Sequence, residues 1–237
     1  MPNSATKRQL PRGRHGLPRE TVIASQRDRI LSAMAAAMTE NGYVGTSVAA
    51  IIKLAGVSRE TFYEQFRSKE DCFEAAYERA VEMLLARIVA SLDGLASLDG
   101  RSAATQDRPE APAGREQRIE SMLGAYLGGL AAEPADARLF LIEVYAVGSE
   151  AIARRARLQE SFVAMVADIL EARTDEQLFA CQTLVAALSA MVTARVAAED
   201  MDGLRALRDP LLGLLRRSGE LFGAPPPLRA SGQTLVP

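Results

Sequence analysis

The stretch TSVAAIIKLAGVSRETFYEQFRSKEDCF, residues 46–73, decides the fold of this chain. It predicts two short helices separated by a tight turn, followed by the start of a long third helix. Gly56 suits the turn, because glycine adopts the left-handed backbone conformation at little cost. Serines that can cap a helix stand before each predicted start, at Ser47, Ser58 and Ser68. This order is typical of a helix-turn-helix, the unit that lays its second helix in a DNA groove.

The second short helix carries two aromatic residues on one face. Phe62 and Phe66 lie four positions apart, so they share a side of the helix. We expect them to pack on apolar residues of the first helix and the turn, which are Ile52, Leu54 and Val57. The opposite side is polar and is predicted to be presented to a partner. The alternative is an ordinary packed pair of helices whose polar face meets only water.

The segment from about residue 27 to about residue 85 resembles the DNA-binding domain of TetR-type transcriptional regulators. The shared features are a Thr-Ser pair, a Gly-Val-Ser turn, an aromatic recognition helix and a lysine that opens the fourth helix. Here they are Thr46, Ser47, Gly56, Val57, Ser58, Thr61, Phe62, Tyr63, Phe66 and Lys69. Gln65 departs from the pattern, because histidine or tyrosine often stands there. Beyond this region the resemblance is only architectural.

The resemblance implies which side chains contact DNA. Phosphate contacts are expected from hydroxyl and amine donors and from helix N-termini, near Thr46, Ser47, Ser58, Thr61, Tyr63 and Lys69. Base reading is expected from Arg59, Glu60 and also Thr61, since arginine pairs with guanine and glutamate accepts from cytosine.

Charge is unevenly distributed along the chain. Residues 1–70 hold eleven Lys or Arg and six Asp or Glu, a balance of +5, so that the remainder carries −7 of the overall −2. A DNA reader needs local positive charge rather than a basic chain. Within residues 1–17, Arg12 and Arg14 could enter an adjacent minor groove, or they could belong to a solvated tail.

The composition predicts an all-α chain. The 237 residues are 48% hydrophobic and rich in alanine and leucine, with little strand-like alternation. We expect an N-terminal three-helix DNA-binding domain followed by a C-terminal helical bundle for effector binding and dimerisation. The expected ranges are a basic arm at 1–17, the DNA-binding domain at 18–73 with its helix-turn-helix at about 47–66, the bundle at 74–223 with a loop at 94–114, and a flexible tail at 224–237.

The residue types argue against an enzyme, a metal site or a cofactor. The one histidine, His15, lies in the predicted arm, and the chain has no Gly-rich phosphate loop and no paired metal-ligand spacing. Its two cysteines, Cys72 and Cys181, are expected to be reduced in a cytoplasmic protein. No apolar run reaches about 18 residues, so no membrane span is expected.

The predicted bundle helices supply candidates for an effector pocket. Pro134 is expected to open one helix and Gly148 to end it, while Ser149 and Thr174 are expected to cap the next two. Because TetR-type proteins usually hold a small effector among their middle helices, the candidates are Tyr77, Met122, Tyr126, Phe140, Glu143, Tyr145, Phe162 and Met165. An acid such as Glu143 is costly when buried unpaired. If it faced a cavity, a cationic or polyhydroxylated effector would be favoured.

The last two predicted helices are more apolar than one buried face requires. In TetR-type proteins the final pair forms a two-fold interface, which implies a homodimer through Leu184, Leu188, Met191, Leu207, Leu211 and Leu214. The expected function is a regulator, most simply a repressor, that binds a double-stranded DNA operator and is released by an unknown small molecule. The alternative is a helical interaction module whose helix-turn-helix binds protein.

Overall fold

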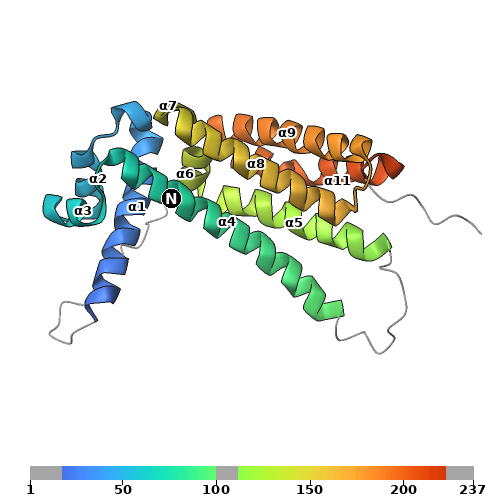
Figure 1. The fold of residues 1–237 in the computed structure, drawn as a ribbon, viewed down its shortest axis with the longest axis horizontal. Helices are drawn as coiled ribbons and strands as arrows, with labels where there is room; N and C mark the ends of the chain where they lie inside the picture. Colours follow the sequence, from blue (N-terminus) through green and yellow to red (C-terminus); the bar gives the residue numbers. More distant parts are fainter. Residues whose placement is uncertain (1–17, 100–111, 223–237) are drawn as a thin grey trace, which may run out of the picture.

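The computed structural model describes residues 18–99 and 112–222, and within these ranges every regular element is a helix (Figure 1). The arm at 1–17, the middle of the expected loop and the tail at 224–237 lie outside the described residues. The elements are α1 (Arg19–Gly45), α2 (Val48–Ala55), α3 (Arg59–Gln65), α4 (Lys69–Asp99), α5 (Pro112–Ala132), α6 (Pro134–Arg138), the π-helix η1 (Leu139–Glu143), α7 (Val144–Val147), α8 (Ser149–Leu170), α9 (Asp175–Ala197), α10 (Met201–Ala206), α11 (Arg208–Arg217) and the 3₁₀ turn η2 (Gly219–Leu221).

The first three helices and the start of α4 form a small unit at one end of the molecule, which we call the reader unit (Figure 1). Its core consists of side chains that are almost fully buried, namely Ile30, Met34, Met38, Ile51, Phe62, Phe66 and Phe73. Ile23 in the first turns of α1 is 42% exposed and lies outside this core. Gly42 kinks the end of α1 with a φ of 65°.

Helix α4 runs from the reader unit into the bundle, where it lies side by side with α5 (Figure 1). They approach closely at Gly129, where a β-carbon would stand 2.9 Å from Leu84 Cδ1. Helix α4 continues through Gly94 to Asp99, and α5 begins at Pro112. Helix therefore occupies both ends of the segment expected to be a loop at 94–114.

The segment between Pro134 and Gly148 is a bent helix that packs against α1. Pro134 occupies the first turn of α6, and Gly148 ends α7 with a φ of 143°, as the sequence predicts. Between them, residues 139–143 widen into a π-helix that sequence did not predict. Such bulges insert one extra residue into a turn and occur often at functional sites.

Helices α8, α9 and α11 complete the bundle (Figure 1). Thr174 and Gln177 form the predicted capping box at the start of α9. The expectation for Ser149 was wrong, because Ser149 is the first residue of α8 and makes no capping bond. Helix α9 ends at Ala197, and Asp200 caps α10 by accepting from Gly203 N at 2.8 Å.

The outer side of α9 is largely uncovered. By length and composition this helix is apolar enough to cross a membrane, a test that the core helix of a soluble protein also passes, yet only 17% of its most apolar window is buried. One helix of this kind is weak evidence for a membrane span, so the expectation that the chain has none stays a prediction. Because α9 packs on α8 and α10 with one side, the remaining side is an apolar surface without a partner in the described chain.

Candidate nucleic-acid interface and internal cavity

The short helix α3 is fixed from beneath by its two phenylalanines and at its start by Ser58. Phe62 and Phe66 are 0% and 2% exposed, as their spacing predicts. Ser58 Oγ accepts from Thr61 N at 3.0 Å and lies 2.9 Å from the Thr61 hydroxyl. A helix of seven residues is marginal alone, so these anchors are what hold α3 in place. Leu54, expected beneath it, is 50% exposed and does not contribute.

The outer face of α3 presents a cationic and aromatic pair. Arg59 and Glu60 are exposed, and Tyr63 is 44% exposed. The Arg59 guanidinium lies 5.2 Å from the centre of the Tyr63 ring, and its Nη2 donates to the Tyr63 hydroxyl at 3.5 Å. Thr61 is half-buried beside them. The expected base-reading residues therefore lie together at the exposed start of one helix.

The other expected DNA contacts differ in accessibility. Ser47 is exposed and caps α2 by accepting from Ala50 N at 3.2 Å. Thr46 is only 2% exposed, and its hydroxyl donates to Gly42 O at 2.7 Å, so the structure does not present it to a ligand. Arg12 and Arg14 lie outside the described residues. Two exposed cations that sequence reasoning missed, Lys53 and Arg67, flank α3.

Lys69 and Tyr43 lie in contact at the junction between α1 and α4. Lys69 Nζ donates to Tyr43 O at 3.0 Å and lies 4.1 Å from the centre of the Tyr43 ring. The Tyr43 hydroxyl donates to Glu70 at 2.9 Å. Burial, and then the hydrogen bond to Glu70, raise the pKa of Tyr43 well above its usual value. Tyr43 is thus a neutral, packed residue, and the amine of Lys69 is bonded inside the protein.

Glu143 joins this junction to the bundle. It is buried, with 6% exposed, and its Oε2 accepts from Tyr43 N at 2.8 Å, while Oε1 accepts from Arg138 Nε at 3.1 Å. Arg154 on α8 adds a second connection through ion pairs to Glu74 and Glu78 on α4. Glu143 is not among the residues that line the cavity between the bundle helices, so its charge gives no reason to expect a cationic or polyhydroxylated effector there.

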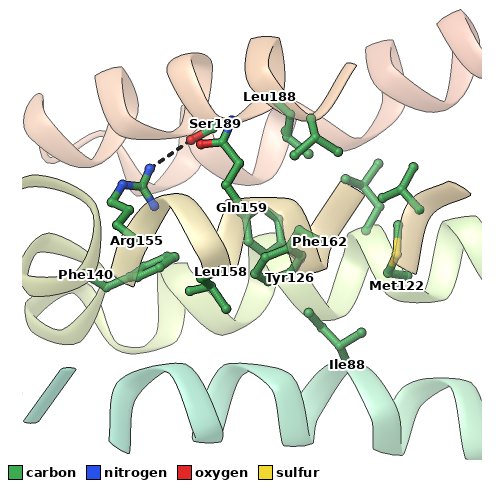
Figure 2. A pocket seen from close by; sticks show the side chains of 13 residues that line it. Ile88, Met122, Tyr126, Phe140, Arg155, Leu158, Gln159, Phe162, Leu188 and Ser189 are labelled. Carbon is green, nitrogen blue, oxygen red and sulfur yellow. Dashed lines mark hydrogen bonds between the residues drawn. The ribbon is translucent and has the colours of Figure 1, made fainter. Parts of the chain in front are cut away.

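A cavity of about 560 Å³, counting space open to solvent, lies among α4, α5, η1, α8 and α9. Four of the predicted pocket residues line it, namely Met122, Tyr126, Phe140 and Phe162 (Figure 2). Three others lie elsewhere. Tyr77 is buried in contact with the Phe73 and Phe140 rings, and neither Tyr145 nor Met165 lines the cavity.

The polar end of the cavity was missed by sequence reasoning. It consists of Arg155, Gln159 and Ser189, with Arg155 only 6% exposed (Figure 2). Arg155 Nε donates to the Tyr145 hydroxyl at 3.1 Å, and its Nη2 donates to Ser189 Oγ at 2.9 Å. A signal was present, because Arg155 shares the helical spacing of the inward-facing residues Ala151, Leu158 and Phe162.

The charge of Arg155 acts within an apolar setting. Burial raises the pKa of Tyr126 to about 12, and the Arg155 cation opposes that rise. The guanidinium also lies 5.1 Å from the centre of the Phe140 ring. In the described ranges, no group of three or more His, Cys, Asp and Glu side chains could hold a metal ion.

The residues predicted for a dimer interface fall on both sides of the last helices. Leu184 and Leu188 line the interior, and Leu211 is 5% exposed. Leu207 is half-buried, whereas Met191 and Leu214 are 38% and 47% exposed. The uncovered side of α9 also carries Phe179, which is 69% exposed, and a row of exposed alanines, Ala186, Ala187, Ala190 and Ala194.

Comparison with known proteins supports the helix-turn-helix that this geometry indicates. Residues 30–76 match the family described as bacterial regulatory proteins, tetR family. No curated protein matches the chain.

Solved structures share the fold at low sequence identity. The fatty acid degradation regulator FadR of Bacillus halodurans is 21% identical, with a TM-score of 0.60 over 81% of this chain and 98% of that one. FadR of Bacillus subtilis, solved with stearoyl-CoA, is 19% identical, with a TM-score of 0.61 over 79% and 96%. A TetR-like regulator of Rhodococcus sp. RHA1 is 19% identical, with a TM-score of 0.59 over 86% and 100%.

The buried phenylalanines, the exposed face of α3 and the helical bundle define an all-α chain with an N-terminal helix-turn-helix. The match over residues 30–76 shows that this N-terminal unit is similar to the N-terminal domain of tetR-family regulators, and the whole described chain shares the fold of the solved regulators.

Proposed function

We propose that this chain is a ligand-released repressor that binds operator DNA as a homodimer. The observation that carries the proposal is the exposed Arg59–Tyr63 pair on a helix whose opposite side is anchored by Phe62. In a major groove, Arg59 is placed to read a guanine, while Ser47 and Tyr63 are placed to contact phosphates. The positive balance of residues 1–70 favours such a site.

The dimer is proposed to form through the uncovered side of α9. Exposed alanines allow the backbones of two helices to approach closely, and Phe179 and Met191 supply apolar contact area. An apolar surface of this kind is unusual on a monomer and is typical of a subunit interface. A two-fold axis there would place two α3 helices against successive turns of DNA, ~34 Å apart or a multiple of that.

Release is proposed to follow from a ligand in the cavity. Phe140 forms part of the cavity wall and lies in the same π-helix as Glu143, which bonds to Tyr43 N in the reader unit. A ligand that shifts Phe140 therefore acts on an element that contacts the reader directly. Such a ligand would favour the arrangement that does not fit the operator, which lowers the affinity for DNA. The apolar walls suit a ligand with an apolar body, and the Bacillus subtilis relative was solved with one such compound, stearoyl-CoA.

Selection of bound duplexes from a random pool, followed by gel-shift titration of the selected site, tests the proposal. The expected result is a two-fold symmetric site bound by two copies of the chain. Repetition of the titration with candidate effectors should show lower affinity with at least one of them. Binding with no preference among duplexes would overturn the proposal, because a repressor needs a specific operator.

A further inference from the structure

Arg155 is a buried cation without a buried anion beside it. Among the described residues no carboxylate lies within ion-pair distance of it, and its bonded partners are the neutral hydroxyls of Tyr145 and Ser189. A buried charge is costly unless another charge or several hydrogen bonds compensate it. The described residues occupy Nε and Nη2 and leave Nη1 without a hydrogen-bond partner. One edge of the guanidinium is therefore available to an anion.

The side chains around Arg155 favour an anionic ligand over a cationic one. None of the residues that line the cavity is an aspartate or a glutamate, and the polar ones besides Arg155 are Gln159, Ser189 and Tyr126. These side chains donate hydrogen bonds and carry no charge near neutral pH. A cationic ligand would meet an unbalanced like charge here, whereas a carboxylate would meet a fork of N–H donors.

The apolar space extends beyond this cavity. A second cavity of about 420 Å³, again counting space open to solvent, shares five lining residues with the first and is lined only by apolar side chains, including Ile119, Leu211 and Leu215. On α8 the lining extends from Arg155 to Leu170, fifteen residues, which is about 22 Å at a rise of 1.5 Å per residue. Figure 2 shows Arg155 at one end and Met122, which borders both cavities, towards the other. The two cavities are therefore neighbours along α8, and Arg155 is the one charged residue among those that line them.

We propose that Arg155 binds the carboxylate of a straight-chain fatty acid whose tail lies along α8 towards Leu215. The inference rests on the proposed function, because it names the ligand class of the same cavity. A fatty acid differs from its coenzyme A thioester in the group that would meet Arg155. A thioester has no charge on its acyl carbonyl, so it would leave the guanidinium unpaired.

Calorimetric titration of the full chain, without DNA, tests the anchor directly. Palmitate is expected to bind, and hexadecanol and palmitoyl-CoA are expected to bind at least tenfold more weakly. Arg155→Gln should weaken palmitate binding roughly 10- to 100-fold, as for the loss of a hydrogen-bonded charge pair. Arg155→Lys should fall between the two, since it keeps the charge and loses the fork. Arg157→Gln, an exposed position on the same helix, serves as the matched control.

The position of the tail has its own test. Leu215→Phe fills the far end of the second cavity, so it should weaken palmitate binding and leave octanoate binding unchanged. Circular dichroism melting of each variant verifies that it folds. If Arg155→Gln does not fold, the comparison of palmitate with hexadecanol on the native chain still decides the matter. Equal binding of acid and alcohol, or preference for the thioester, would overturn the proposal.

The two proposals fail in different ways. If palmitate binds through Arg155 but leaves operator affinity unchanged, the effector role fails and the anchor stands. If another compound releases the protein from its operator while no fatty acid binds, the carboxylate proposal fails and the proposal of a ligand-released repressor stands.

Discussion

Glu143 in the bundle and Tyr43 in the reader unit, one hundred positions apart, share a buried hydrogen bond of 2.8 Å from Tyr43 N to Glu143 Oε2. The bond ties the end of α1 to the π-helix η1, and the second oxygen of the same carboxylate pairs with Arg138. One side chain therefore connects the wall of the cavity with the unit that carries α3. We expect this contact to govern how ligand binding reaches DNA.

Glu143→Leu should destabilise the fold and weaken the coupling. The substitution leaves Tyr43 N buried without an acceptor, which costs about 1–3 kcal/mol. Urea unfolding measures the loss, and operator titration with and without ligand measures the coupling. Glu143→Gln is the matched control, because its amide oxygen can still accept from Tyr43 N. If the leucine and glutamine variants respond to ligand as the native chain does, Glu143 is structural only.

Substitutions on α3 should separate base reading from phosphate contact. Arg59→Ala should cost about 1–3 kcal/mol on the selected operator and relax the preference at one base pair. Tyr63→Phe should weaken binding to all duplexes alike, because it removes only a hydroxyl that can contact phosphate. Gel-shift titrations on the operator and on single-base variants distinguish the two patterns. Unchanged affinity for both variants would mean that α3 does not face DNA.

Phe62→Ala should remove α3 from the folded structure. Truncation of a fully buried phenylalanine costs about 3–5 kcal/mol, and here it removes the main anchor of a seven-residue helix. We expect a lower melting temperature by circular dichroism and loss of specific DNA binding. Tyr63→Phe is the control, because it should melt like the native chain. Native-like DNA binding by Phe62→Ala would show that α3 is held by other contacts.

A charge on the uncovered side of α9 should break the dimer. Phe179→Glu places a carboxylate in the proposed apolar interface, where it has no partner. Light scattering after size exclusion should then report a monomer, and operator affinity should fall because the two readers are no longer linked. Val89→Glu on α4, where Val89 is 49% exposed, should leave the dimer intact because α4 is not part of the proposed interface. A dimeric Phe179→Glu variant would place the interface elsewhere.

Alkaline pH should destabilise the fold through Cys72. Burial raises the pKa of this thiol from its usual 9.0 to about 12. The unfolded chain therefore loses the proton at a lower pH than the folded chain does, so the free energy of unfolding falls as pH rises from about 9 towards about 12. Urea unfolding at about pH 8 and about pH 10 measures the slope. Cys72→Ala should flatten that slope, and an unchanged slope would assign it to other groups.

The reader unit could be predicted from sequence because its signals are local. Ser47, Ser58 and Gly56 act within a few residues of themselves, and the structure places each where its chemistry requires. The accessibility of Thr46 could not be predicted, because its burial depends on how α1 ends at Gly42.

The bundle was harder to predict because its helices are apolar on more than one side. In α9, Leu188 faces the cavity and Met191 faces outward, and no difference in residue type separates them. The π-helix η1 depends on contacts with α1 that lie far away in sequence. Arg155 was overlooked because arginine in a helix is usually on the surface.

Gly129 sets a dimension of the whole assembly. Its missing side chain lets Leu84 of α4 lie against the backbone of α5, and the same α4 begins at Lys69 in the reader unit. A β-carbon at position 129 would force Leu84 Cδ1 to another position, so the close contact of α4 with α5 depends on the absence of a side chain there. Because α4 runs from this contact into the helix-turn-helix, the way that Leu84 packs bears on where α3 is held in the proposed dimer, and with it on the length of spacer DNA that an operator can contain.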